Sequence, residues 1–180
     1  MGESDPLVEL LDESRASDMV AARARERQLR RMEQEGAELA GTLVDLAEHA
    51  SPVTMATVAG RRHHGVVIGV GGDYCVLRAD NETEVHLRLD AITTVRPHPG
   101  GRHDVASGAR RPVTEGLLLE VLGRVAGERR RVSLVTRTGE VVAGELRAVG
   151  TDVVSLRLDG TGGDICYVAA GALSEAMLDA

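Results

Sequence analysis

The chain has 180 residues, of which 43% are hydrophobic and 27% charged, as in an ordinary globular protein with room for one or two domains. Its formal net charge of −7 argues against a protein that coats nucleic acid over its whole surface. No apolar run approaches the length that crosses a membrane, and two Cys do not make a disulfide framework, so we expect a cytoplasmic protein. With two Tyr, no Phe and no Trp, the core must be built from Val, Leu and Ala.

Residues 1–35 are predicted to form a helical extension dominated by one long helix. Asp5 can cap a helix that begins at Pro6, and apolar residues recur behind it at helical spacing. Positions 23–31 hold five Arg. Such a run favours a solvated helix face, with a nucleic-acid-binding or partner-binding ridge as the alternative. Gly36 is expected to end the extension.

The rest of the chain contains one sequence unit twice. Glycines and their neighbours recur after 79 residues, in the pairs Gly60/Gly139, Gly65/Gly144, Gly71/Gly150, Asp73/Asp152 and Leu77-Arg78/Leu156-Arg157. A helix predicted at 39–49 recurs as well, because its apolar face Leu39, Leu43, Leu46 corresponds to Leu118, Leu122, Val125. A fixed offset kept through so many glycines indicates a tandem duplication. We therefore predict a first unit at 36–97 and a second unit at 114–180, joined by a Gly- and Pro-rich linker at 98–113.

Each unit is predicted to add five short strands to its helix. In the first unit these strands fall at 53–57, 65–70, 73–79, 84–89 and 91–95, with glycines at the bends. Alternation places Val85, Leu87 and Leu89 inward, and Glu84, His86 and Arg88 outward, and it also places Tyr74 and Tyr167 outward. The predicted fold class is α+β, mainly β: a long N-terminal helix followed by two tandem helix-plus-five-strand small barrels.

The first unit resembles the Sm-like family, in particular the bacterial RNA chaperones of the Hfq type. Residues 52–60 are similar to that family's first strand and turn glycine, Gly65-Val66-Val67 to its second strand, and 91–97 to its closing strand. The resemblance covers most of 40–97 and, more loosely, 118–176. It implies Sm-like barrels, RNA binding, and pairing of edge strands between barrels in a ring. We expect the tandem units to satisfy part of this pairing within one chain.

The residues that contact RNA in that family have no counterparts here. Where the family's uridine pocket has an aromatic residue, this sequence has Asp73, and where the pocket has a Lys-His pair, it has Leu89-Asp90. The second unit has Asp152 and Ala170-Gly171 at these places. Because an aspartate at a phosphate-facing position repels the ligand, the resemblance assigns no RNA-contact residue.

Clusters of Arg and His are the candidate nucleic-acid contacts instead. The run at 61–64 is interpreted as a basic turn that contacts phosphates, with a plain exposed hairpin tip as the alternative. The run at 129–131 could join the linker arginines in one patch, or only favour a helix dipole. The candidate residues are Arg61, Arg62, His63, His64, Arg96, Arg110, Arg111, Arg129, Arg130 and Arg131.

The sequence predicts no catalytic constellation, metal site or cofactor site, and Cys75 and Cys166 are interpreted as small buried hydrophobic residues. The leading hypothesis is a non-enzymatic protein that binds RNA weakly through Arg-rich loops and the linker. The alternative is a protein-interaction scaffold that uses the N-terminal helix and the barrel edges, with no nucleic-acid role. In both cases we expect self-association through edge strands or through the apolar outer face formed by Ala56, Val58, Val66 and Ile68.

Overall fold

A computed structural model describes residues 37–98, 116–160 and 162–178, together with Met19, Arg23, Arg25 and Gln28. The predicted long helix, most of the linker, and Arg110 and Arg111 with it, lie outside the described residues. In the described part of the chain, no helix is long and apolar enough to cross a membrane.

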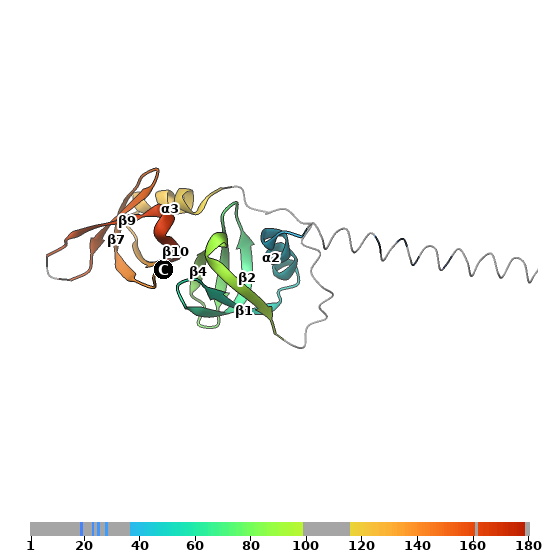
Figure 1. Cartoon of the computed structure of the whole chain (residues 1–180). Helices are drawn as coiled ribbons and strands as arrows, with labels where there is room; N and C mark the ends of the chain where they lie inside the picture. The colour runs from blue at the N-terminus through green and yellow to red at the C-terminus, as the bar shows by residue number, and fades with distance from the viewer. Residues whose placement is uncertain are drawn as a thin grey trace, which may run out of the picture.

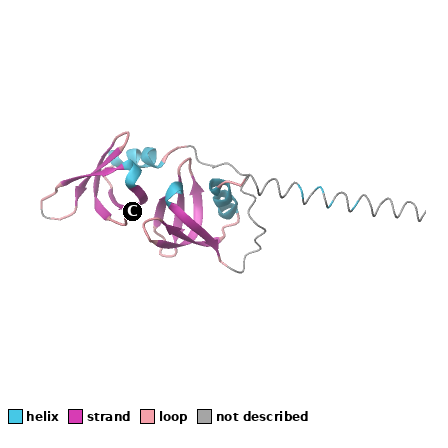
Figure 2. Ribbon diagram, viewed as in Figure 1, coloured by secondary structure: helices cyan, strands magenta, loops and turns pink. Residues whose placement is uncertain are grey.

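The two units have the same elements in the same order (Figures 1 and 2). The first unit comprises α2 (Leu39–Glu48), β1 (Pro52–Thr57), β2 (Arg62–Val70), β3 (Tyr74–Ala79), β4 (Glu84–Arg88), the 3₁₀ turn η1 (Leu89–Ala91) and β5 (Ile92–Pro97). The second comprises α3 (Leu118–Gly127), β6 (Arg131–Thr136), β7 (Val141–Val149), β8 (Val153–Leu158), β9 (Ile165–Ala169), η2 (Ala170–Ala172) and β10 (Leu173–Leu178). Corresponding elements are equal in length, so the sequence repeat is also a structural repeat.

The prediction of two separate tandem barrels is wrong. All ten strands belong to one antiparallel sheet, in the order β5-β1-β2-β3-β4-β10-β6-β7-β8-β9. The α-helices whose bounds lie within the described residues are the short α2 and α3. The reason is that β10 pairs with β6 of its own unit and also with β4 of the other unit. Hydrogen bonding therefore runs on from one unit into the next. The protein is mainly β, and the expected pairing of edge strands between the tandem units is present.

Each unit has its own apolar cluster, covered by its own helix. α2 packs on β2 and contributes Leu43, Val44 and Leu46 to the first cluster, and α3 packs on β7 and contributes Leu118 and Leu122 to the second. Close contact between β2 and β3 requires a glycine, because a side chain at Gly65 would collide with the carbonyl group of Arg78, and Gly144 lies in the same way against Arg157.

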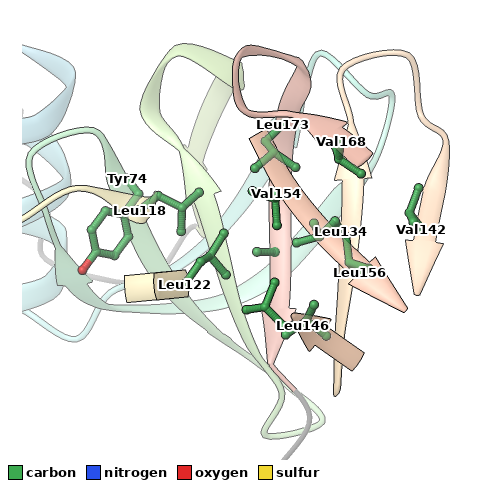
Figure 3. Packing of buried hydrophobic residues seen from close by; sticks show 12 residues of the cluster. Tyr74, Leu118, Leu122, Leu134, Val142, Leu146, Val154, Leu156, Val168 and Leu173 are labelled. Carbon is green, nitrogen blue, oxygen red and sulfur yellow. The ribbon is translucent and has the colours of Figure 1, made fainter. Parts of the chain in front are cut away.

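Two residues predicted to face outward are buried. Tyr74 and His86 are only 5% and 7% exposed, and their rings stack with centroids 5.9 Å apart. Figure 3 shows Tyr74, from the first unit, beside Leu118 of α3, within the cluster of the second unit. Strand alternation placed these side chains correctly on the outer face of the first unit, but the second unit covers that face.

Candidate functional site

The contact between the two units combines a strand ladder with side chains that cross from each unit into the other. Its backbone part is the β4–β10 ladder, in which Val85, His86 and Leu87 lie opposite Met177, Ala176 and Glu175. Side chains cross the contact in both directions, since Tyr74 belongs to the second cluster and Met177 packs against the first. We call this contact the intrachain junction.

A buried acid from the second unit lies among polar groups of the first. The Glu175 side chain is fully buried, and one carboxylate oxygen accepts a hydrogen bond from Thr57 Oγ1 at 2.7 Å. The other oxygen lies 2.9 Å from Nε2 of His63 and 3.2 Å from Nε of Arg61. Burial by itself would raise the pKa of Glu175, but the hydrogen bonds from His63 and Thr57 and the charges of His63 and Arg61 outweigh burial and lower it. The carboxylate is therefore held in its charged form inside the junction.

The junction also caps a helix. Asp73 Oδ1 accepts a hydrogen bond from the backbone N–H of Leu118, at the start of α3, over 2.8 Å. The N–H of Gly72 donates to the carbonyl of Gly116 over 2.9 Å. An acid that satisfies a free N–H group at a helix N-terminus stabilises that helix. Asp73, interpreted from the sequence as a residue that would repel RNA, is thus part of the contact between units.

A further ion pair lies at the rim of the junction. Arg137, in the turn after β6, reaches the first unit and places Nη2 2.6 Å from Oδ2 of Asp90. Its Nε donates to the carbonyl of Gly171 over 3.1 Å. Because Asp90 is 55% exposed at its side chain, we assign this pair an orienting role rather than a large share of the stability.

Three of the predicted nucleic-acid residues gather on one exposed face. Cross-strand partners place His64 and Arg96 on either side of Thr54, and Arg62 beside Ala56, on the outer side of β5, β1 and β2. Thr54 Oγ1 lies 2.9 Å from Nδ1 of His64 and 2.9 Å from Nε2 of His98. We call Arg62, His64, Arg96 and His98 the basic face. The second unit has Val141, Ala143 and Met177 in place of the first three, so this face is not duplicated.

The other predicted residues do not form the expected patch. Arg61 and His63 turn to Glu175, so they belong to the junction. Arg131 pairs with Asp159, with Nε donating to Oδ2 over 3.0 Å. That hydrogen bond lowers the pKa of Asp159. Arg129 is exposed after α3 with a left-handed φ of 53°, and Arg130 follows it half-buried. Arg110 and Arg111 lie outside the described residues, so their contribution stays a prediction.

Sequence reasoning missed Glu175, Thr57 and His98. Glu175 and Thr57 lie 118 positions apart in the chain, and nothing local marks an acid in a short strand as a partner for a distant threonine. His98 follows β5 in a segment interpreted as linker, and only the ladder between β5 and β1 brings it to His64.

The thiol of Cys75 is not placed to react. Cys75 is fully buried, and desolvation raises its pKa to about 12, so the thiolate is not populated near neutral pH. Cys166 is half-buried on β9. Within the described ranges, no group of three or more His, Cys, Asp or Glu side chains is placed to hold a metal ion.

The sheet has two open ends. β5 pairs only with β1, and β9 pairs only with β8, among the described strands. Large apolar side chains are exposed close to the second of these ends: Ile165 is 49% and Tyr167 is 71% exposed on β9. Leu39, the first residue of α2, is 39% exposed. Unpaired strand edges with apolar side chains are surfaces that proteins usually cover.

Neither a protein-family model nor a curated protein sequence matches the chain. The interpretation of the site consequently depends on its geometry.

Proposed function

We propose that the chain is a non-enzymatic assembly module whose copies associate through the open sheet edges β5 and β9. The observation that carries this proposal is the intrachain junction. There, the fifth strand of one unit fills the open edge beside the fourth strand of the other unit. The same two kinds of edge, a fifth strand and a fourth strand, end the sheet at β5 and β9. Exposed Tyr167 and Ile165 on β9 support association at that end.

The test is the mass of the full chain in solution over a dilution series, by light scattering after size exclusion. We expect an assembly that dissociates on dilution, and Tyr167→Pro should weaken it because proline removes a backbone donor from the edge. Ile68→Ser tests the apolar outer face instead: Ile68 is 39% exposed on the interior strand β2, so a chain that associates through its sheet edges should stay assembled with this substitution. A wild-type chain that stays monomeric up to about 100 µM would have a dissociation constant above that concentration. This result would refute the proposal.

The basic face favours a second function, weak binding of single-stranded RNA. Two Arg and two His gathered on one exposed surface could contact phosphates, and the charge of the histidines would increase as the pH falls. Assembly would bring several such faces together and strengthen a weak contact through multivalency. The resemblance to Sm-like proteins points the same way and stays a prediction.

RNA binding is tested by titrating a short RNA at two salt concentrations. Affinity should decrease with salt, and Arg62→Ala/Arg96→Ala should reduce the slope of log affinity against log salt by about 1–2. Arg147→Ala is the control, because Arg147 pairs with Glu145 on the second unit. Binding that does not depend on salt, or that both variants reduce equally, would remove this function.

A further inference from the structure

The bases of the basic face differ from the other bases of the first unit in having no acid beside them. Arg61, Arg78 and Arg88 each form an ion pair with an acid. No acid of the described residues pairs with Arg62 or Arg96, and all four side chains of the basic face are exposed. Bases gathered in this way attract a negatively charged partner.

Thr54 holds the two histidines of the basic face in place. Its hydroxyl lies 2.9 Å from a ring nitrogen of His64 and 2.9 Å from one of His98, and the ring centroids are 6.2 Å apart. Because a hydroxyl has one proton to donate, at least one of the two rings donates to it. A carboxylate that binds here therefore meets side chains that are already ordered, and the contact does not have to order them itself.

The apolar outer face adjoins the basic face on the same two strands. Ala56 lies opposite Arg62 in the ladder between β1 and β2. Val58, just after β1, is 43% exposed, and Ile68, on β2, is 39% exposed. Exposed apolar side chains next to a charged surface are typical of a site that another segment covers. A partner for the whole surface needs acids and apolar side chains within one short stretch.

Residues 3–13 of the same chain have this composition. They contain no Arg, Lys or His, and their acids are Glu3, Asp5, Glu9, Asp12 and Glu13, with Leu7, Val8, Leu10 and Leu11 between them. We infer that this acidic segment, residues 3–13, covers the basic face and the apolar outer face of the first unit of its own chain. The contact goes beyond the proposed assembly, because it uses the outer sides of the strands and not their hydrogen-bonding edges.

The connection to the first unit is long enough for this contact. Residues 14–36 join the acidic segment to the described part of the chain, and even at the helical rise of 1.5 Å per residue they span about 35 Å. The nine residues of β2 are about 30 Å long. Residues 37–38 are not helical, and α2, which follows them, packs on β2. The acidic segment is thus tethered beside a strand that carries both faces.

A weak contact is sufficient because the segment is tethered. Tethering raises the local concentration of a segment to the order of 1 mM. A Kd of about 1 mM for the separate segment would then leave the surface covered in about half of the chains. Attraction between exposed charges extends over about 10 Å at 0.1 M salt but only about 3 Å at 1 M. The surface should therefore be covered at low salt and open at about 1 M salt.

Paramagnetic broadening of backbone amide signals in the full chain tests the contact. A nitroxide is attached at Ser4→Cys in a Cys166→Ser background, in which the remaining Cys75 is fully buried. At low salt, the amide signals of Thr54 and His64 should lose intensity relative to the same protein with the nitroxide reduced. Those of β8, in the second unit, should keep their intensity. At about 1 M salt the loss at Thr54 and His64 should disappear.

Substitution of acids tests which part of the chain makes the contact. Glu9→Gln/Glu13→Gln removes two negative charges from the acidic segment and should reduce the broadening of the basic face. Glu33→Gln/Glu35→Gln is the matched control, because it makes the same change of net charge between the acidic segment and α2. The control should retain the broadening of the wild type.

Substitution of bases tests the other side of the contact. Arg62→Gln/Arg96→Gln removes the two arginines of the basic face and should abolish the broadening. Arg129→Gln/Arg147→Gln is the matched control, because it removes two exposed arginines from the second unit. Both controls together distinguish a specific contact from a general effect of net charge.

The outcomes separate this inference from the proposed function. Absence of broadening in the wild type at low salt, or broadening that neither the acid nor the base substitutions reduce, would overturn the inference. A mixed sample, with nitroxide and isotope label on different chains, should show no broadening. Broadening in that sample would make a second copy the source, and the contact within one chain would be wrong. None of these signals requires assembly, so a monomeric wild type would refute the proposed function and leave this inference standing.

Discussion

Replacing Glu175 by glutamine is the sharpest test of what holds the two units together. The substitution preserves the shape of the side chain but removes the charge that lies 2.9 Å from His63 and 3.2 Å from Arg61. Breaking a fully buried ion pair costs about 3–5 kcal/mol. Because Arg61 is 37% exposed and water can solvate it, we expect a smaller loss of about 2–3 kcal/mol. For a protein of this size, that corresponds to a decrease in Tm of about 5–10 °C.

Urea unfolding at pH 7, followed by circular dichroism, measures this loss. Glu145→Gln is the control, because Glu145 pairs with Arg147 at the surface over 2.8 Å and should contribute about 0.5 kcal/mol or less. The folded-state pKa of Glu175 lies below its ordinary value of 4.5. Its stabilisation is therefore complete above pH 4.5 and is lost as the pH falls through the folded-state value, a loss that Glu175→Gln should not show. A Glu175→Gln protein as stable as the control would refute the importance assigned to the cluster.

Three further changes test the packing of the sheet and the turns. Burial lowers the pKa of His86 below its ordinary value of 6.5, and the charge of Glu84 opposes this shift. The contribution of His86 to the free energy of unfolding should thus be complete above pH 6.5 and decrease below it. Urea unfolding of His86→Leu at several pH values should show a free energy of unfolding that depends less on pH. Gly65→Ala should destabilise by about 3 kcal/mol through collision with the carbonyl of Arg78, whereas Gly123→Ala, in the open interior of α3, should stabilise by about 1 kcal/mol in the same urea assay. Arg129→Gly should raise stability by about 0.5–1 kcal/mol in thermal unfolding, because glycine relieves the left-handed φ of 53°, and an unchanged Tm would contradict this reason.

The elements of both units could be predicted from the sequence because their signals are local. Alternation of apolar residues marks β4, and glycine positions mark the bends, since a side chain at Gly65 would strike the neighbouring strand. The helix at 39–49 was predicted from one apolar face, and α2 occupies Leu39–Glu48. The repeat doubled the evidence for each of these elements. Of the candidate site, the sequence indicated the bases but not their partners.

The sequence by itself therefore determined the order of elements, the inward side of each strand and the duplication, all of which depend on neighbours a few residues apart. Only the tertiary structure decided that β10 joins β4, because strand pairing between units depends on backbone groups that every sequence has. That one pairing buried Tyr74 and His86, which alternation had placed at the surface. It also turned Arg61 and His63 from candidate RNA contacts into partners of Glu175, since a buried carboxylate requires charge and hydrogen bonds wherever the fold places it.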